Sequence, residues 1–218
     1  MLPALALALL FAQTAQPAQA ACLCLKCLTG QWKHFVAVSG AMKPAIEPDA
    51  CLYVQRGAPV DRGRIIAFTH PARPDTTMIF RLIGLPGDSV ELQAGQIVLN
   101  GTPVPQAPTA PYLQIMQAEG ATGSRPICGT PGIGNGQTCP IPRLTETLPD
   151  GTAWQVLDID PQGRSDTAGP FTVPPDHVFV LGDNRDNAND SRIDPAAFGM
   201  GFIPAANILG PVVEIANP

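Results

Sequence analysis

Proline and glycine recur so often along this chain that little room is left for long helices. The 218 residues include 25 Pro and 21 Gly, the two residue types that a helix interior tolerates least. Short apolar runs lie between them, and runs bounded by turn residues are typical of β-strands. The sequence therefore predicts an all-β fold built from coiled antiparallel sheets.

The apolar runs give the expected positions of the strands. We expect strands over residues 34–38, 51–55, 64–69, 78–84, 89–92, 96–99, 154–159, 178–181, 202–204 and 207–215. Pro71 and Pro74 are expected to end the strand that begins at Arg64, because proline cannot donate to a sheet ladder. Ala94-Gly95 predicts a hairpin turn, and Asn100-Gly101 a further turn.

The composition favours a folded protein and excludes some partners. Hydrophobic residues make up 45% of the chain, which is enough for a core, and the length suits one domain or a core with an insert. The net charge is −5 and no basic patch is present. Nucleic acid is therefore not expected as a partner, and neither is attraction to anionic lipid headgroups.

The first twenty residues are interpreted as a secretory signal peptide. The apolar run 2–12 is too short to span a bilayer, and Ala18-Gln19-Ala20 fits a small-x-small cleavage site. Two alternatives stay open: a truncated start with a membrane anchor upstream, or an uncleaved hydrophobic anchor. All three interpretations place the folded part outside the cytoplasm, in the periplasm or at the outer face of the inner membrane.

Six cysteines suit an oxidising compartment, where pairing is expected. Cys128 and Cys139 bracket a Gly/Pro-rich loop and are predicted to form a disulfide. Cys51 is expected to pack as a small buried hydrophobe. Four interpretations remain open for the cysteines just after the leader, namely local disulfides, free thiols, metal ligands or lipidation at the first of them: Cys22, Cys24 and Cys27.

The densest polar stretch is Gly182 to Arg192, GDNRDNANDSR, which directly follows the apolar run 178–181. A solvated turn rich in Asn and Asp is one interpretation. The alternation of acids with arginines beside a core strand favours another, a buried network of paired charges. Two further stretches carry related signals: SGAMKP over residues 39–44 and RLIGLPGD over residues 81–88.

In this order and spacing the three stretches resemble the signal peptidase I family, membrane-bound Ser-Lys peptidases that remove signal peptides. That family has the patterns S-x-S-M-x-P, K-R-x-x-G-x-P-G-D and G-D-N-x-x-x-S-x-D-S-R. The resemblance extends from about residue 35 to residue 211, apart from a middle insertion. The motif residues that match are Met42, Pro44, Arg81, Gly84, Pro86, Gly87, Asp88, Gly182, Asp183, Asn184, Asp190, Ser191 and Arg192.

The chain departs from the family at the three positions that carry the chemistry. Ala41 stands where the family has its nucleophilic Ser, and Phe80 stands where it has the general-base Lys. Ala188 replaces the Ser that orients the lysine amine. Lys43 falls on a variable position of the first motif, where no catalytic group is expected. Peptide hydrolysis needs a nucleophile and a base, so the substitutions predict an inactive homologue.

The remaining motif residues are expected to bind peptide or to hold the frame. The resemblance implies that Ser39 and the backbone N–H of Ala41, with Met42 beside them, form an oxyanion or peptide-binding site. A salt-bridged structural network is expected from Arg81, Asp88, Asp183, Arg185, Asp190 and Arg192. No cofactor and no metal site is expected.

The domain organisation follows from the same comparison. Residues 1–20 form the leader and residues 21–32 a cysteine-containing tether. Residues 33–104 and 170–218 form the signal-peptidase-like core. Residues 105–169, where Pro and Gly rise, resemble the variable second subdomain that signal peptidases insert into that core.

Three functions remain in competition. The first is a non-catalytic homologue that binds signal-peptide-like or pilin-like extended peptides. The second is an active serine endopeptidase with a rearranged site that uses Ser39. The third is a β-rich structural or interaction module. The resemblance also allows association with a membrane surface, and the sequence leaves the oligomeric state open.

Overall fold

The computed structural model describes residues 22–197 and 199–218, so the interpretation of residues 1–20 lies outside the described part. The predicted all-β fold is confirmed, because the described residues form fourteen strands and four short 3₁₀ helices. All strand pairs between named strands are antiparallel.

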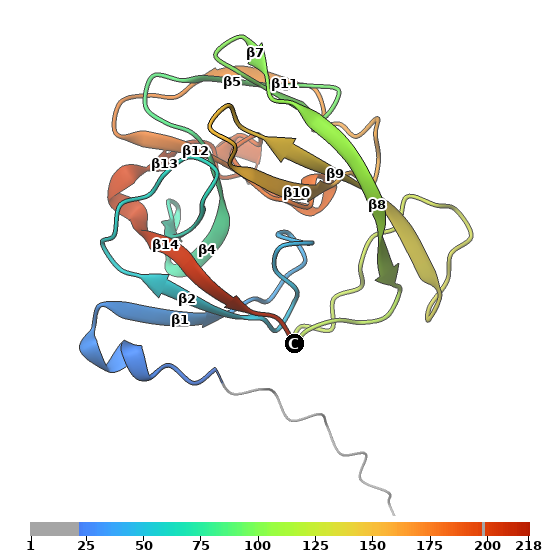
Figure 1. The fold of residues 1–218 in the computed structure, drawn as a ribbon, viewed down its shortest axis with the longest axis horizontal. Coiled ribbons are helices and arrows are strands. Elements are labelled where there is room, and N and C mark those ends of the chain that lie inside the picture. Colours follow the sequence, from blue (N-terminus) through green and yellow to red (C-terminus); the bar gives the residue numbers. More distant parts are fainter. Residues whose placement is uncertain (1–21, 198) are drawn as a thin grey trace, which may run out of the picture.

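Three sheets make up the described part of the chain (Figure 1). The largest has the order β1-β2-β14-β3-β4-β12-β13, and its strands are β1 Trp32–Val36, β2 Cys51–Gln55, β3 Ile65–His70, β4 Arg73–Gly84, β12 His177–Leu181, β13 Ile203–Pro204 and β14 Ile208–Ala216. The second has the order β11-β5-β6-β7, with β5 Ser89–Gln93, β6 Gln96–Leu99, β7 Thr102–Pro103 and β11 Ala168–Thr172. The third, β10-β9-β8, consists of β8 Gln106–Ile115, β9 Thr138–Thr147 and β10 Ala153–Leu157. The 3₁₀ helices are η1 Leu25–Thr29, η2 Arg185–Asn187, η3 Pro195–Ala197 and η4 Ala205–Asn207.

The strands over 51–55 and 96–99 lie where the sequence predicts them, and most others differ by one or two residues at their ends. The hairpin at Ala94-Gly95 is confirmed, since Gln93 pairs with Gln96 across a two-residue turn. Both turn residues have positive φ, 48° and 79°, which is the backbone of the turns that match the twist of a hairpin.

The positions of prolines predicted the ends of strands less well than Ala94-Gly95 predicted its hairpin. Pro74 was expected to end a strand, but it lies inside β4, near the exposed beginning of that long strand. The long strands β8 and β9 were not predicted, because Pro108, Pro140 and Pro142 interrupt their apolar pattern. β10 pairs only with residues 143–147 of β9, so Pro140 and Pro142 lie where β9 has a strand partner on one side alone.

Strand β12 separates two hydrophobic cores. Successive side chains of a strand point to opposite faces, and β12 is buried on both. Val178 and Val180 pack into one core with Phe68 and Phe80. Phe179 and Leu181 pack into the other, which includes Trp154 of the third sheet. The polar stretch that begins at Gly182 therefore starts between two buried layers.

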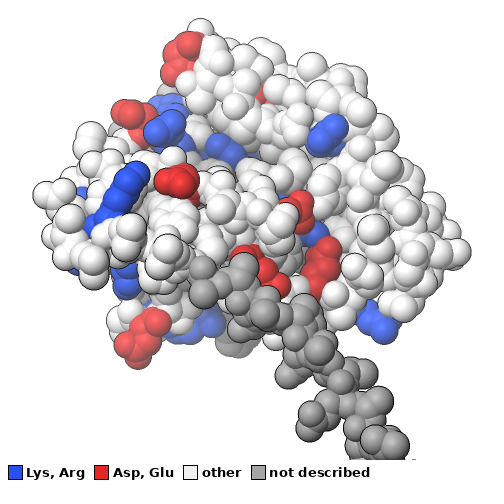
Figure 2. All heavy atoms as spheres, turned by 60° about the horizontal axis from the view of Figure 1, so that its bottom comes forward, with Lys and Arg blue, Asp and Glu red and all other residues white. Residues whose placement is uncertain are grey.

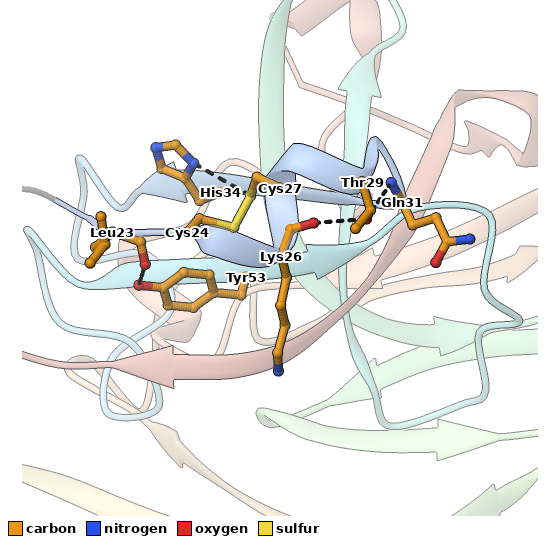
Figure 3. The surroundings of a disulfide bond; sticks show 8 residues. All are labelled: Leu23, Cys24, Lys26, Cys27, Thr29, Gln31, His34 and Tyr53. Carbon is orange, nitrogen blue, oxygen red and sulfur yellow. Dashed lines mark hydrogen bonds between the residues drawn. A yellow bond between two sulfur atoms is a disulfide. The ribbon is translucent and has the colours of Figure 1, made fainter.

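Three disulfides hold the described chain. Cys128 bonds to Cys139, as predicted, with their Cα atoms 6.1 Å apart. The expectation for Cys51 was wrong: it is buried, but it is bonded to Cys22, 29 residues earlier, which fastens the tether to β2. Cys24 bonds to Cys27 around η1, beside His34 (Figure 3). The sulfurs that were open to a metal-ligand interpretation are thus all in disulfides.

The surface shows no concentration of one charge on the face seen in Figure 2, where basic and acidic side chains are scattered among uncharged residues. Among the described residues, no helix is long and apolar enough to cross a membrane. The three disulfides are consistent with a location outside the cytoplasm.

The two N-terminal disulfides should differ in their effect on stability. Cys22→Ser with Cys51→Ser opens a loop of 29 residues and should lower the free energy of unfolding by about 3–4 kcal/mol. Cys24→Ser with Cys27→Ser opens a separation of only 3 residues and should cost about 1–2 kcal/mol. Urea unfolding of both double variants measures the difference, and equal losses would contradict the assigned pairing.

Candidate functional site

The three motif stretches meet at Gly182. A Cβ built on this glycine would overlap the Cβ of Ala188, come within 2.9 Å of the Ala41 carbonyl oxygen, and lie 3.3 Å from the ring of Phe80. Ala41, Phe80 and Ala188, one from each motif stretch or next to it, therefore surround one backbone position. Glycine is needed there for close approach, because any side chain would collide with two of them.

The side chains at these three positions are entirely apolar. Phe80 is 2% exposed and packs in the first core, with its ring centroid 6.3 Å from that of Phe68. Ala41 and Ala188 pack against the same core. None of the three can attack a carbonyl or accept a proton, so the centre of the site is an extension of the hydrophobic core.

Backbone hydrogen bonds hold the first motif against the third. The N–H of Asn184 donates to the Ala41 carbonyl at 3.0 Å, and its side-chain amide donates to the Gly40 carbonyl at 3.0 Å. Lys43 N–H donates to the same Gly40 carbonyl at 3.3 Å, which closes the turn. The turn is thus fixed from both sides.

A buried ion pair joins the second motif to the third. Arg81 donates from Nε to Asp183 Oδ1 at 2.7 Å and from Nη2 to Asp183 Oδ2, a two-bond geometry that suits guanidinium and carboxylate. Its remaining Nη1 donates to the Gly63 carbonyl at 2.6 Å, and its guanidinium lies 5.1 Å from the Trp154 ring centroid. Arg81 therefore contacts three segments that are far from it in sequence.

Two more buried ion pairs extend this network. Arg192 donates from Nε to Asp190 Oδ1 at 2.8 Å, and Asp190 also accepts from the Gly182 N–H at 3.0 Å. Arg185 pairs with Glu146, a fully buried residue of β9. No local signal marks Glu146 in the sequence, because it lies in the inserted segment, 39 residues from its partner Arg185.

Asp88 stabilises the LPGD turn and does not pair with the arginines of the buried network described above. Its carboxylate accepts from the Leu85 N–H at 2.6 Å and from Asn100 Nδ2 at 2.8 Å, and it pairs with Arg62 at 2.8 Å. Burial alone would raise the pKa of Asp88, but the hydrogen bonds from Arg62, Asn100 and Leu85 outweigh it and lower the pKa. Asp88 thus fixes the turn that follows β4.

A small cavity lies beside this frame. It has a volume of about 120 Å³, well below the 300–1,000 Å³ that is common for small-molecule pockets. Ser39 and Gly40 line it from the first motif, and Asn184 and Asn187 from the third. The remaining lining residues include several from the inserted segment: Gln114, Glu119, Ser124, Arg125, Pro126, Ile127 and Ile141.

Lys43 also lines the cavity, although no role was expected for it at a variable position of the motif. Its side chain is 2% exposed, and its Nζ donates to Gln114 Oε1 at 2.7 Å and to both carboxylate oxygens of Glu119 at 2.7 Å. Glu47 lies 3.4 Å from the same amine. Lys43 therefore joins the first motif to the inserted segment through buried charge.

The two remaining motif residues differ in their exposure. Ser39 is exposed at the cavity, and its hydroxyl has no hydrogen bond to any residue within 22–197 and 199–218. Met42 is 4% exposed and packs in the first core, so its side chain contributes to packing. Of these two side chains, only that of Ser39 is therefore accessible from the cavity.

Comparison with known proteins gives a consistent result. A family model described as "Signal peptidase, peptidase S26" matches residues 12–216. The signal peptidase I of Pseudomonas aeruginosa is 30% identical over 198 residues, covering 81% of this chain and 61% of that protein. The signal peptidase I of Rickettsia bellii (strain OSU 85-389) is 34% identical over 158 residues, covering 68% of this chain and 45% of that protein. The chain thus spans about half the length of the curated relatives it matches.

One solved structure was also compared. A signal peptidase I from Enterococcus faecalis V583 is 24% identical, covers 72% of this chain and 98% of its own, and superposes with a TM-score of 0.38.

Removing one partner of the Arg81–Asp183 ion pair should lower the free energy of unfolding more than removing both. Asp183→Ala leaves the Arg81 guanidinium buried without its carboxylate and should lower the free energy of unfolding by about 3–5 kcal/mol. Adding Arg81→Met removes the unpaired charge, so the double variant should be more stable than Asp183→Ala alone. Urea unfolding measures both; additive losses would show that the pair is not coupled.

Proposed function

The chain belongs to the signal peptidase, peptidase S26, family, and we propose that it is a member that binds extended signal-peptide-like segments without cutting them. The observation that carries this proposal is the burial of Phe80 between Ala41 and Ala188, around Gly182. A serine hydroxyl attacks only when a neighbouring group accepts its proton. In this chain the nucleophile, base and orienting positions have all become carbon side chains.

An unpaired strand edge supports peptide binding. β3 pairs with one side of β4, but β12 reaches along the other side only as far as Arg81. The backbone N–H and C=O of Leu82 point toward the β3 side, where they bond to residues 64 and 63. Because the backbone groups of successive strand residues point to opposite sides, those of Thr77 and Ile79 point away from β3. An extended peptide could add to this edge as a further strand.

The cavity supports a preference for small side chains. Its volume of about 120 Å³ suits one small side chain, and it lies against Ser39 at the start of the first motif. Peptides of the Ala-x-Ala type present small side chains at alternate positions, all on one face of an extended strand. We therefore assign signal-peptide-like or pilin-like segments as the ligand class, in the periplasm or at the outer face of the inner membrane.

An active enzyme that uses Ser39 is the alternative that one observation favours. Ser39 is exposed at the cavity, and Lys43 is the amine that lines the same cavity. Gln114 and Glu119, however, accept all the short hydrogen bonds of that amine. Lys43 therefore acts as a structural cation in our proposal.

Restoring the chemistry should require three changes at once. Turnover of a lipid-presented signal-peptide substrate should be absent in the wild type and in Ala41→Ser, because an unassisted serine is a poor nucleophile at neutral pH. The triple variant Ala41→Ser, Phe80→Lys, Ala188→Ser should cleave weakly after Ala-x-Ala, since residues that act as a unit are strongly non-additive. Wild-type turnover abolished by Ser39→Ala would establish the alternative instead.

Binding without cleavage can be tested separately. A fluorescent Ala-x-Ala peptide should bind the wild type, as followed by anisotropy, and should remain intact by mass spectrometry. Thr77→Pro removes an N–H on the free edge and should weaken binding about tenfold, because one backbone hydrogen bond is worth roughly 1 kcal/mol and the ring also crowds the edge. Thr77→Ala keeps that N–H and is the matched control. Equal binding by both variants would refute the proposed edge.

A further inference from the structure

The disulfide between Cys24 and Cys27 is the most accessible of the three disulfides in the described chain. Neither of its cysteines is buried, whereas each of the other two disulfides has one buried cysteine, Cys51 at 8% and Cys139 at 1% exposure. The helix η1 that lies between Cys24 and its partner has no buried residue, and Leu25 is 71% exposed. Because thiol–disulfide exchange requires that a thiolate reach a sulfur, this bond is the one most open to attack.

The same disulfide is also the one that folding should stabilise least. It joins residues only 3 apart in sequence, compared with 29 for Cys22–Cys51 and 11 for Cys128–Cys139. Closing a short loop removes little entropy from the unfolded chain, so folding adds little to keep this bond closed. The bond between Cys22 and Cys51 already fastens the tether to β2. The Cys24–Cys27 bond should therefore be reduced more readily than the other two, and the fold should remain intact.

His34 of β1 lies beside this bond and points toward one of its sulfurs. Its Nδ1 is 3.7 Å from the Sγ of Cys27 (Figure 3). Opposite His34 on β2 is Tyr53, whose hydroxyl donates to the Leu23 carbonyl at 3.1 Å. The amine of Lys26 points away from the sulfurs in Figure 3. A protonated imidazole next to a thiolate stabilises it, so Cys27 is the better leaving group of the two cysteines.

We propose that Cys24 and Cys27 form a redox-active disulfide that oxidises dithiols, with His34 assisting the exchange. A substrate thiolate attacks the sulfur of Cys24, the bond to Cys27 breaks, and Cys27 leaves as a thiolate that takes a proton from His34. The second substrate thiolate then attacks the first substrate sulfur, which closes the substrate disulfide and releases Cys24 as a thiolate. Two electrons pass to the protein, and the two protons that the substrate loses are returned, one through His34 and one from water.

The substrate class is a pair of cysteine thiols close together on one polypeptide. The second thiol of such a pair is held near the mixed disulfide, so the intermediate resolves without a second encounter. A monothiol such as glutathione must collide twice, and its adduct on Cys24 therefore lasts longer. This exchange does not depend on peptide binding at the Phe80 site.

Glutathione buffers test the order in which the disulfides open. The full chain, with its disulfides intact, is equilibrated at increasing ratios of reduced to oxidised glutathione, quenched with acid, alkylated and mapped by mass spectrometry. Cys24–Cys27 should open at a ratio at least about tenfold lower than the other two disulfides, with the circular dichroism of the fold unchanged. The first glutathione adduct should be on Cys24. Joint opening of all three disulfides, or a first adduct on Cys27, would overturn the proposal.

A reduced peptide that carries two cysteines tests the substrate class. The wild type should convert about one equivalent of this peptide to its disulfide, because one two-electron exchange consumes the Cys24–Cys27 bond. The variant Cys24→Ser with Cys27→Ser keeps the other two disulfides and should convert none. A peptide that stays reduced with the wild type, or is oxidised equally by the double variant, would refute the proposed activity.

A histidine variant tests the assisting group. His34→Ala should slow the peptide reaction about tenfold near pH 6 and change it little near pH 9, because only a protonated imidazole carries a charge. His177→Ala, at the start of β12, is the matched control and should react like the wild type. Equal rates for the wild type and His34→Ala at both pH values would contradict the role assigned to His34.

Discussion

The pairing of Arg81 with Asp183 is the interaction on which the rest of this structure depends. It lies between the two hydrophobic cores, joins β4 to the stretch after β12, and extends to Gly63 and to Trp154 of the third sheet. A buried guanidinium is tolerated only with a carboxylate and full hydrogen bonding. Because Arg81 has both, the ion pair holds the polypeptide around Gly182 in place.

The apolar side chains beside this ion pair belong to the core. Phe80, Ala41 and Ala188 fill the centre with carbon and pack into the adjoining core. Burying an aromatic side chain there contributes roughly 2–3 kcal/mol, whereas burying an amine carries a desolvation cost. Enzymes commonly become more stable when a strained or polar active site is replaced.

Sequence reasoning succeeded where the signal was local. The short strands between Pro and Gly established the fold class, and Ala94-Gly95 located its hairpin from two residues. The resemblance assigned Ala41, Phe80 and Ala188 to the three positions of one chemistry, and the structure brings all three to Gly182.

It failed where a residue depends on a distant partner. Lys43 forms an ion pair with Glu119, 76 residues away in sequence, and Arg185 forms one with Glu146, 39 residues away. Cys51 was expected to be unpaired because its partner is one of three closely spaced cysteines. The strands β8 and β9 were hidden by prolines that only a one-sided pairing accommodates.

The central claim is that Phe80 has turned a catalytic position into part of the core, and the stability of Phe80→Lys tests it most directly. Urea unfolding should show a loss of at least about 3 kcal/mol for Phe80→Lys, because the core loses an aromatic ring and gains an amine. Phe80→Leu, which changes size but not polarity, should lose clearly less. If Phe80→Lys were as stable as Phe80→Leu, the position would still accommodate a lysine, and the account would be contradicted.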